Sequence, residues 1–244
     1  MKKPDNITNN DWKLLKQRYE DLDYVIQKLN QNYPVQYLIG YVDFLDAKIM
    51  VNKNVLIPRF ETETLVEKSI QYVKNMNLTE GSALEIGTGS GCISIALKNE
   101  FSTLEITAID VSPKALKLAK RNAKLNKTQM TFIRKNMFKF NPINKYDVLI
   151  SNPPYIKETD IIDPQTQYEP QDAIYGGVDG LKYYEQIFRI AKSSLNKTSL
   201  IALEIDEEAG KILKHLAKEF FPDATIKIEK DLAKKDRYLF VLNK

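Results

Sequence analysis

Cysteine and histidine are almost absent from this chain of 244 residues, which contains one of each, Cys92 and His215. A lone cysteine cannot form an internal disulfide, and one residue of each type is too few for a Cys/His zinc site. The sequence therefore predicts no metal site. A chain without a disulfide framework suits a reducing compartment, so we expect a cytoplasmic location.

Long apolar runs are missing as well. None reaches the roughly 18 residues that a membrane-spanning helix needs, and the opening stretch MKKPDNITNNDWK lacks the apolar segment of a secretory signal. We therefore expect no membrane partner. The net charge of +4 permits an anionic partner without requiring one. Because the lysines are spread along the chain, most should solvate helix faces, and no stable nucleic-acid partner is predicted.

The N-terminal part of the chain has helical patterning and one hairpin. Apolar residues recur at three- and four-residue steps over residues 10–30, which predicts one amphipathic helix that ends before Pro34. Two short strands are expected around residues 52–54. Residues 61–75 should form a second helix, with acidic residues in its first turn, where the helix dipole favours them.

From residue 82 onward, short apolar strands alternate with helical stretches. The expected strands are SALEIG, LEITAID, MTFIRKN, YDVLIS, SLIALEID, ATIKIEK and RYLFVLN. Such runs are typical of buried parallel strands with helices on both faces. The last two are joined by a connection too short for a crossover, so they should be antiparallel. The predicted fold class is α/β, a doubly wound, mostly parallel seven-stranded sheet with an antiparallel last strand.

These patterns divide the chain into three regions. We predict a short N-terminal helical segment at 1–33 and a linker with a β-hairpin and a helix at 34–78. The α/β domain should occupy 79–244, with the boundary near the polar stretch NMNLTEG.

A glycine-rich loop, ALEIGTGSGCISIAL, follows the first strand of that domain and opens a helix. Gly87 allows a tight turn, Gly89 lets a ligand approach the backbone, and Gly91 lets the helix begin close to the sheet. The free N–H groups of the helix start favour an anionic ligand group. The spacing is G-x-G-x-G rather than the G-x-G-x-x-G dinucleotide fingerprint, and no Gly-Lys-Ser/Thr follows.

Two acids lie near this loop. Asp110 ends the second strand, 19 residues after Gly91, where a carboxylate can accept from ribose hydroxyls. Asp110 could instead cap the next helix, but Ser112 is better placed to do so. Glu85 could face a cationic ligand group or be a satisfied strand-end carboxylate. Together the loop and Asp110 predict a cofactor that contains adenosine with a free ribose.

The third strand ends in RKNMF, where an adenine would lie. The Asn136 side chain can serve the edge of an adenine, and Met137 and Phe138 can cover its face. Residues of the last two types belong as often to a core as to a cofactor pocket, so both interpretations stay open.

The fourth strand ends in Asn152-Pro153-Pro154-Tyr155. Two prolines make a stiff loop at the sheet edge where ligands of open α/β folds bind. Such a loop holds the Asn152 carboxamide and nearby carbonyls in place for a planar –NH₂ group, and Tyr155 can cover the flat face of that group. The motif alone does not distinguish an amide from an adenine.

Several longer stretches carry a resemblance. They are PVQYLIGYVDF, VLIPRFETETLVE, EIGTGSGCISIAL, AIDVSPKALKLAKRNA, YDVLISNPPYI and YEPQDAIYGGVDGLKYY. The chain resembles the Rossmann-like S-adenosylmethionine-dependent methyltransferases, and within them the bacterial peptide chain release factor glutamine methyltransferases (the HemK/PrmC family). Adenine-N6 methyltransferases share NPPY, whereas the QYLIG and VLIPRFETE block is specific to the glutamine enzymes.

The resemblance implies transfer of a methyl group from S-adenosyl-L-methionine to the N5 amide nitrogen of the glutamine in the Gly-Gly-Gln motif of class I release factors, leaving S-adenosyl-L-homocysteine. The cofactor residues would be Glu85, Gly87, Thr88, Gly89, Ser90, Gly91, Asp110, Met137 and Asn152. The substrate glutamine would be held by Asn152, Pro153, Pro154 and Tyr155, with Asn152, Pro153 and Tyr155 as the catalytic set.

The chain departs from the usual family pattern at three places. Members usually carry Asp where this chain has Glu85, an acid where it has Asn136, and Pro where it has Phe60. A single helix before Pro34 would also be a shortened N-terminal helical region, which affects how a release factor docks. Residues 156–179 form a long connection that we expect to act as a lid over the substrate amide.

Two other activities fit part of the pattern. An adenine-N6 methyltransferase acting on DNA or RNA would share NPPY, but no aromatic and basic patch for base stacking stands out. A nicotinamide-dependent oxidoreductase would use the same kind of sheet, but its glycine spacing differs and it leaves NPPY without a role.

Overall fold

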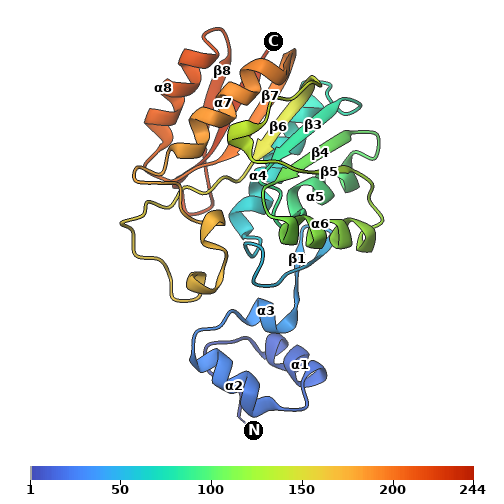
Figure 1. Ribbon diagram of the computed structural model, residues 1–244, viewed down its shortest axis with the longest axis vertical. Coiled ribbons are helices and arrows are strands. Elements are labelled where there is room, and N and C mark those ends of the chain that lie inside the picture. The colour runs from blue at the N-terminus through green and yellow to red at the C-terminus, as the bar shows by residue number, and fades with distance from the viewer. Residues whose placement is uncertain (1) are drawn as a thin grey trace.

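The computed structural model describes residues 2–244 and is built around one large sheet (Figure 1). Its strands run in the order β5-β4-β3-β6-β7-β9-β8. Their bounds are β3 (Ser82–Ile86), β4 (Glu105–Asp110), β5 (Thr131–Arg134), β6 (Tyr146–Ser151), β7 (Leu195–Glu204), β8 (Thr225–Lys230) and β9 (Asp236–Asn243). Neighbours from β5 to β7 are parallel, and β9 is antiparallel to both β7 and β8. The predicted fold class is confirmed.

Helices cover both faces of this sheet because successive strand residues point to opposite sides. Ala83 and Val148 pack in one core with α4 (Phe60–Asn75), α5 (Cys92–Glu100) and α6 (Pro113–Leu125). Leu84 and Leu149, one residue further along, pack in a second core with α7 (Lys182–Ser194) and α8 (Gly210–Phe220). Continuously apolar strands therefore support two helical layers, as their composition predicted.

The N-terminal region differs from the prediction of one helix over residues 10–30. It contains α1 (Asn9–Arg18), α2 (Leu22–Asn30) and the short α3 (Val35–Ile39). The chain is extended at Tyr19, and the Asp21 carboxylate then accepts a hydrogen bond of 3.0 Å from the Tyr24 N–H and starts the second helix. The prediction was wrong because a periodic apolar pattern continues across a tight helix–helix connection, whereas the cap that restarts the helix is a local feature.

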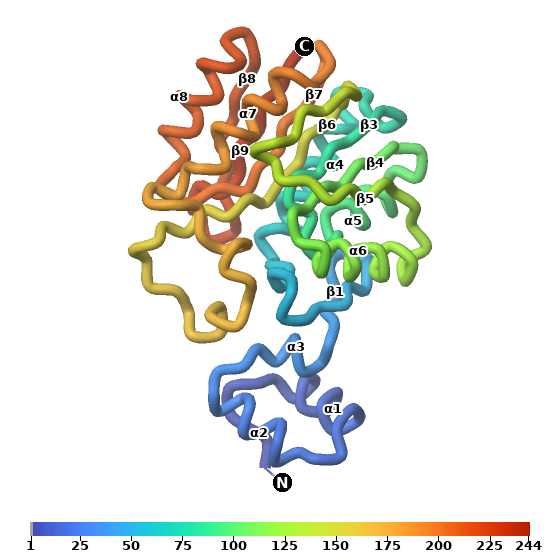
Figure 2. Tube along the Cα trace, in the orientation of Figure 1, coloured from blue at the N-terminus to red at the C-terminus, as the bar shows by residue number. Residues whose placement is uncertain are grey.

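These three helices have a small core of their own. It contains Ile7, Trp12, Leu15, Val25, Leu29, Leu38 and Ile39. In Figure 2 they form a separate layer at the N-terminal end, beyond the sheet, with the segment between β6 and α7 extending toward them. A partner that approached this side of the sheet would therefore also meet these helices.

The hairpin also lies elsewhere than predicted. Its strands are β1 (Tyr41–Phe44) and β2 (Ala47–Met50), so the turn is at residues 45–46 rather than 52–54. Leu45 takes a positive φ of 47° there. The Asn52 side chain accepts from the Asn54 N–H at 3.0 Å and forms a turn after the hairpin. The hairpin turn was misplaced because the polar residues at 52–54 are typical of a turn. The hairpin turn at 45–46 contains a leucine, which is not a typical turn residue.

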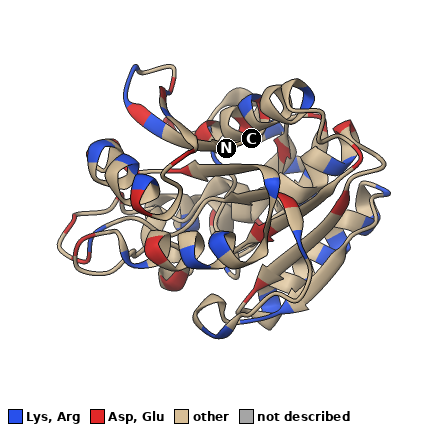
Figure 3. Ribbon diagram, turned by 90° about the horizontal axis from the view of Figure 1, so that it is seen from above, with Lys and Arg blue, Asp and Glu red and all other residues tan. Residues whose placement is uncertain are grey.

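Charged residues are distributed over most elements. In the view of Figure 3, basic and acidic segments interleave along the helices and strands. Within residues 2–244, no helix combines the length and the apolar character that crossing a membrane requires.

Candidate functional site

A cavity of about 530 Å³ opens at the carboxyl ends of β3, β4 and β6. The glycine loop, Asp110, residues 135–138 and residues 151–154 line it, together with Thr62 from α4. Ligands of open α/β folds bind at this edge of the sheet. The structure thus brings most sequence-predicted site residues to one cavity, with Gly91 and Tyr155 as the exceptions.

The glycine loop takes left-handed backbone conformations at the cavity wall. Gly87, Gly89 and Gly91 have φ values of 74°, 54° and 84°. A Cβ on Gly87 or Gly89 would meet no atom within 4 Å, so both face open space, whereas one on Gly91 would lie 3.2 Å from the Ala119 Cβ. The first two glycines leave the backbone accessible to a ligand, and the third allows close packing of α5 on α6.

Glu85 is buried beside this loop. The Thr88 hydroxyl donates to its Oε2 at 2.6 Å, and the Ser94 hydroxyl donates to the same oxygen. The other oxygen, Oε1, has no partner within the described residues. Burial raises the pKa of Glu85 to about 7, against the opposing effect of the two hydroxyls. A buried carboxylate oxygen without a partner at a cavity wall suits a ligand that carries N–H groups.

Asp110 holds the glycine loop in place. Its Oδ2 accepts from the Gly89 N–H at 2.9 Å, and its Oδ1 accepts from the Ser112 N–H at 2.8 Å. The Ser112 hydroxyl accepts from the Ala115 N–H and caps α6, so the expectation that Ser112 is the cap is confirmed. Burial raises the pKa of Asp110. Asp110 lines the cavity, and each of its carboxylate oxygens can accept a further hydrogen bond.

Residues after β5 form the outer wall. The Asn136 side chain accepts from the Phe138 N–H at 2.9 Å and caps the short helix η1 (Met137–Lys139). The Phe138 ring lies 5.6 Å from the Tyr183 ring, and the Lys182 ammonium lies over both rings. Tyr183 and Lys182 line the cavity but were missed from the sequence, because an amphipathic helix start carries no signal for a wall residue.

The Asn152 carboxamide is oriented by α4. Its Nδ2 donates to the Thr62 hydroxyl oxygen at 3.1 Å. Within residues 2–244, no donor is hydrogen-bonded to its Oδ1. Pro153 and Pro154 continue the cavity wall. The asparagine therefore presents an acceptor to a ligand.

Tyr155 lies beside the cavity rather than in its wall. Its hydroxyl donates to Glu204 Oε1 at 3.2 Å, and the Thr62 hydroxyl donates to Glu204 Oε2 at 2.7 Å. Burial raises the pKa of Tyr155 well above its usual value. Thr62 and Glu204 were not predicted as site residues. Thr62 lies within the quoted VLIPRFETE block. Glu204 lies in the predicted strand SLIALEID, part of which also carries the family resemblance, but that pattern gave its side chain no role.

The part of the segment between β6 and α7 around residues 168–173 is tied to the N-terminal half of the chain. Glu169 is buried, pairs with Arg59 and accepts from the Ile57 N–H at 2.8 Å. The Tyr168 hydroxyl donates to the Gln31 carbonyl of the N-terminal helices at 2.7 Å. Pro170, Asp172 and Ala173 of this segment line the cavity. It covers part of the cavity, and its closure as a lid stays a prediction.

The sheet order and the position of this cavity define an α/β methyltransferase fold. The profile of the Methyltransferase small domain family matches residues 62–169. A methyltransferase from Pyrococcus furiosus superposes with a TM-score of 0.60 at 20% identity, over 81% of this chain and 89% of its own. The ribosomal protein L11 methylase from Lactobacillus delbrueckii superposes with a TM-score of 0.56 at 17% identity, over 80% and 85% of the two chains.

Sequence relatives define the family more narrowly. A release factor glutamine methyltransferase from Flavobacterium psychrophilum is 36% identical over 99% of this chain and 86% of its own length. One from Enterococcus faecalis is 37% identical over 89% of this chain and 79% of its own. The chain belongs to the release factor glutamine methyltransferase family.

Proposed function

We propose that this protein transfers a methyl group from S-adenosyl-L-methionine to the N5 side-chain nitrogen of the Gly-Gly-Gln glutamine in class I peptide chain release factors. One observation carries the proposal beyond family membership. The Asn152 carboxamide donates to Thr62 and has an unengaged acceptor, Oδ1, at the cavity that the glycine loop also lines. A substrate –NH₂ needs such an acceptor close to the methyl donor.

The residues at the loop end of the cavity fit this cofactor. Gly87 and Gly89 leave room for the methionine part to approach the backbone, with Thr88, Ser90 and Gly91 completing the loop. The unpartnered Glu85 Oε1 suits its ammonium group, and Asp110 suits its ribose hydroxyls. Met137 lines the cavity and would border the adenine. When bound, the cofactor supplies an electrophilic sulfonium methyl group and leaves as S-adenosyl-L-homocysteine.

Asn152 and a neighbouring backbone carbonyl, with Pro153 as the candidate, would accept the two N–H bonds of the target amide. That arrangement orients the nitrogen lone pair toward the methyl group and stabilises the positive charge that develops on nitrogen. Pro154 would border the amide. Tyr155 lies beside the cavity, where its hydroxyl donates to Glu204, and would support the loop that binds the amide.

The new N–C bond would form as the S–C bond of the cofactor breaks, and the alkylated amide nitrogen, which is strongly acidic, would release one proton to solvent. No nucleophilic side chain or histidine base is therefore required for this transfer. Burial raises the pKa of the Cys92 thiol to about 12, so it is protonated at neutral pH. His215 is exposed on α8 and lies 3.4 Å from Glu219. Positioning and electrostatic stabilisation would therefore supply most of the rate acceleration.

A class I release factor is the proposed partner, and the cytoplasm is the proposed site of action. The N-terminal helices and the 156–179 segment meet through Tyr168 and are candidates for the docking surface. The division of the chain at 33/34 and 78/79 stays a working proposal.

The test uses the full chain, labelled S-adenosylmethionine and either a class I release factor or duplex DNA. We expect label on the Gly-Gly-Gln glutamine, located by mass spectrometry. A release factor with glutamate at that position is the matched control, since it lacks the amide nitrogen and should stay unlabelled. Label on adenine but none on the release factor would overturn the proposal in favour of an adenine-N6 activity.

A further inference from the structure

Glu204 is a buried carboxylate held by neutral hydroxyl groups. Both of its oxygens accept, Oε2 from the Thr62 hydroxyl at 2.7 Å and Oε1 from the Tyr155 hydroxyl at 3.2 Å. The side chain lies at the end of β7 and is almost completely buried. Burying a charge without a direct cationic partner is costly. Because of this cost, we expect the Glu204 carboxylate to have a role other than packing.

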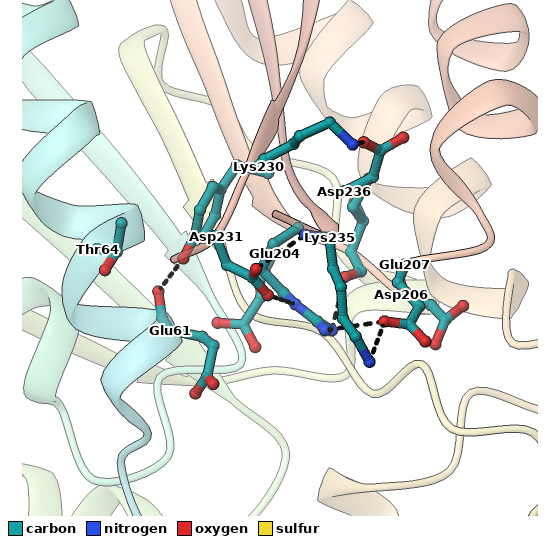
Figure 4. A network of polar contacts seen from close by, with 12 residues as sticks. Glu61, Thr64, Glu204, Asp206, Glu207, Lys230, Asp231, Lys235 and Asp236 are labelled. Carbon is teal, nitrogen blue, oxygen red and sulfur yellow. Dashed lines mark hydrogen bonds and ion pairs between the residues drawn. The ribbon is translucent and has the colours of Figure 1, made fainter. Parts of the chain in front are cut away.

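The nearest guanidinium is committed elsewhere. Arg237 Nε lies 3.2 Å from Asp231 Oδ2, and its Nη1 donates to the Ile205 carbonyl. Figure 4 shows Glu204 next to this network, which also includes an ion pair of Lys235 with Glu207. Arg237 acts on Glu204 through its charge and does not donate a hydrogen bond to it. The two hydroxyl groups are therefore the direct partners of the carboxylate.

One of those hydroxyls, that of Thr62, connects Glu204 to Asn152. Thr62 has one hydroxyl proton, and it donates this proton to Glu204 Oε2 at 2.7 Å. Its oxygen is then left to accept, and it accepts from Asn152 Nδ2 at 3.1 Å. An amide that donates through Nδ2 in this direction must present Oδ1 on the other side. Asn152, Thr62 and Glu204 thus form a series of hydrogen bonds, and the Glu204 carboxylate, which can only accept, sets the direction of each bond in it.

We infer that Glu204 is a positioning residue, which acts through Thr62 to keep the Asn152 carbonyl oxygen, rather than its –NH₂, turned toward the substrate. This inference rests on the proposed function, because it assigns the substrate –NH₂ as the group that Oδ1 accepts from. The series crosses the fold, from β7 through α4 to the loop after β6. It gives Thr62 of the VLIPRFETE block a task at the substrate end of the cavity.

Protonation of Glu204 would weaken or reverse the series. A proton on Oε2 would be donated to Thr62, whose hydroxyl would then donate toward Asn152 and favour the flipped carboxamide. A proton on Oε1 would leave Thr62 donating to a neutral acceptor, which is a weaker bond. Burial raises the pKa of Glu204 to about 7, so this change falls near neutral pH.

Other groups around Glu204 bear on this titration. On α4 it faces Glu61, whose charge raises the Glu204 pKa, and on β9 it faces Arg237, whose charge lowers it. The remaining titratable neighbours are Tyr155, Tyr184, Asp206 and Tyr238, which come from the loop after β6, from α7, from the residues after β7 and from β9.

The first test compares two threonines of the same helix. Thr62→Val removes the hydroxyl but keeps the shape, and we expect kcat to fall at least tenfold while cofactor affinity stays within about twofold. Thr62→Ser keeps the hydroxyl and should retain most of kcat. Thr64→Val is the matched control, because the Thr64 hydroxyl contacts the Phe60 carbonyl at 3.4 Å and the Tyr238 side chain, and Thr64 does not line the cavity. Equal kcat for Thr62→Val and Thr64→Val would overturn the inference.

The second test needs no turnover. The side-chain ¹H–¹⁵N signal of Asn152, assigned by its loss in Asn152→Ala, should shift with pH with a midpoint near the Glu204 pKa of about 7. In the isosteric Glu204→Gln variant this shift should disappear. A signal that titrates equally in both proteins, or in neither, would overturn the inference. The proposed function fails separately, if wild-type enzyme leaves the release factor unlabelled.

Discussion

A buried glutamate stands at or behind each end of the cavity. Glu85 lines the end that we assign to the cofactor, and Glu204 lies behind Thr62 and Asn152 at the end that we assign to the substrate. Burial raises the pKa of both to about 7. Each accepts from two hydroxyl groups. They differ in what is left over, since Glu85 keeps an unpartnered oxygen and Glu204 has none.

That difference separates two uses of the same side chain. A carboxylate with a free oxygen at a cavity wall is prepared to bind a ligand directly. One with both oxygens occupied by the protein can only act on its neighbours, here Thr62 and Tyr155. Variants at the two ends should therefore fail in different ways, in cofactor affinity at one end and in turnover at the other.

The largest effect is expected at the substrate end. Asn152→Ala removes the acceptor for the target amide and should lower kcat by roughly 10²–10³-fold, by analogy with the loss of one preorganised polar contact. Cofactor affinity should survive, as measured by calorimetry. Asn196→Ala is the control, because Asn196 is an exposed asparagine on β7. Near-normal turnover of Asn152→Ala would remove Asn152 from the chemistry.

At the cofactor end, the effect should appear in binding. Asp110→Ala removes the proposed acceptor for the ribose and frees the Gly89 N–H, so cofactor affinity should fall by about 10–100-fold. Titration calorimetry measures this directly. Asp223→Ala, at an exposed aspartate before β8, should leave the affinity unchanged. An unchanged affinity in Asp110→Ala would contradict its assignment to the cofactor.

The shared property of the two glutamates predicts a common pH dependence of stability. Their folded pKa values of about 7 lie above the ordinary 4.5, so the folded protein holds protons that the unfolded chain has released. The free energy of unfolding should therefore fall as the pH rises from about 5 to about 7, on the order of a few kcal/mol in all.

Urea unfolding at a series of pH values measures this slope. Glu85→Gln and Glu204→Gln should each flatten part of it, and saturating cofactor should flatten the Glu85 part by stabilising its charged form. A slope unchanged in both variants would show that neither carboxyl titrates in this range.

The smallest effect on turnover and cofactor affinity is expected for a residue outside the cavity. His215 is exposed on α8, and substituting it with glutamine should change neither turnover nor affinity, with stability changed by no more than about 0.5 kcal/mol. Steady-state kinetics with the release factor measures this. A large loss of turnover would reveal a proton transfer that the proposed mechanism omits.

Much of the cofactor end was readable in the sequence because its features are local. The G-x-G-x-G spacing, the strand-ending Asp110 and the Ser112 cap lie within 26 residues of one another, counted from position 87 to position 112. Two local features were misjudged. The break at Tyr19 splits the first helix, and the hairpin turn at residues 45–46 contains a leucine instead of the expected polar residues.

The sequence by itself determined the doubly wound sheet, the glycine loop and the stiff Asn-Pro-Pro-Tyr loop, because periodicity, glycine spacing and proline act over a few residues. Only the tertiary structure decided which carboxylate stands behind Asn152. Thr62 and Asn152 are 90 residues apart, and Thr62 and Glu204 are 142 apart. They meet because β7 lies beside β6 and α4 packs across both, and no local pattern encodes the order of strands in a sheet.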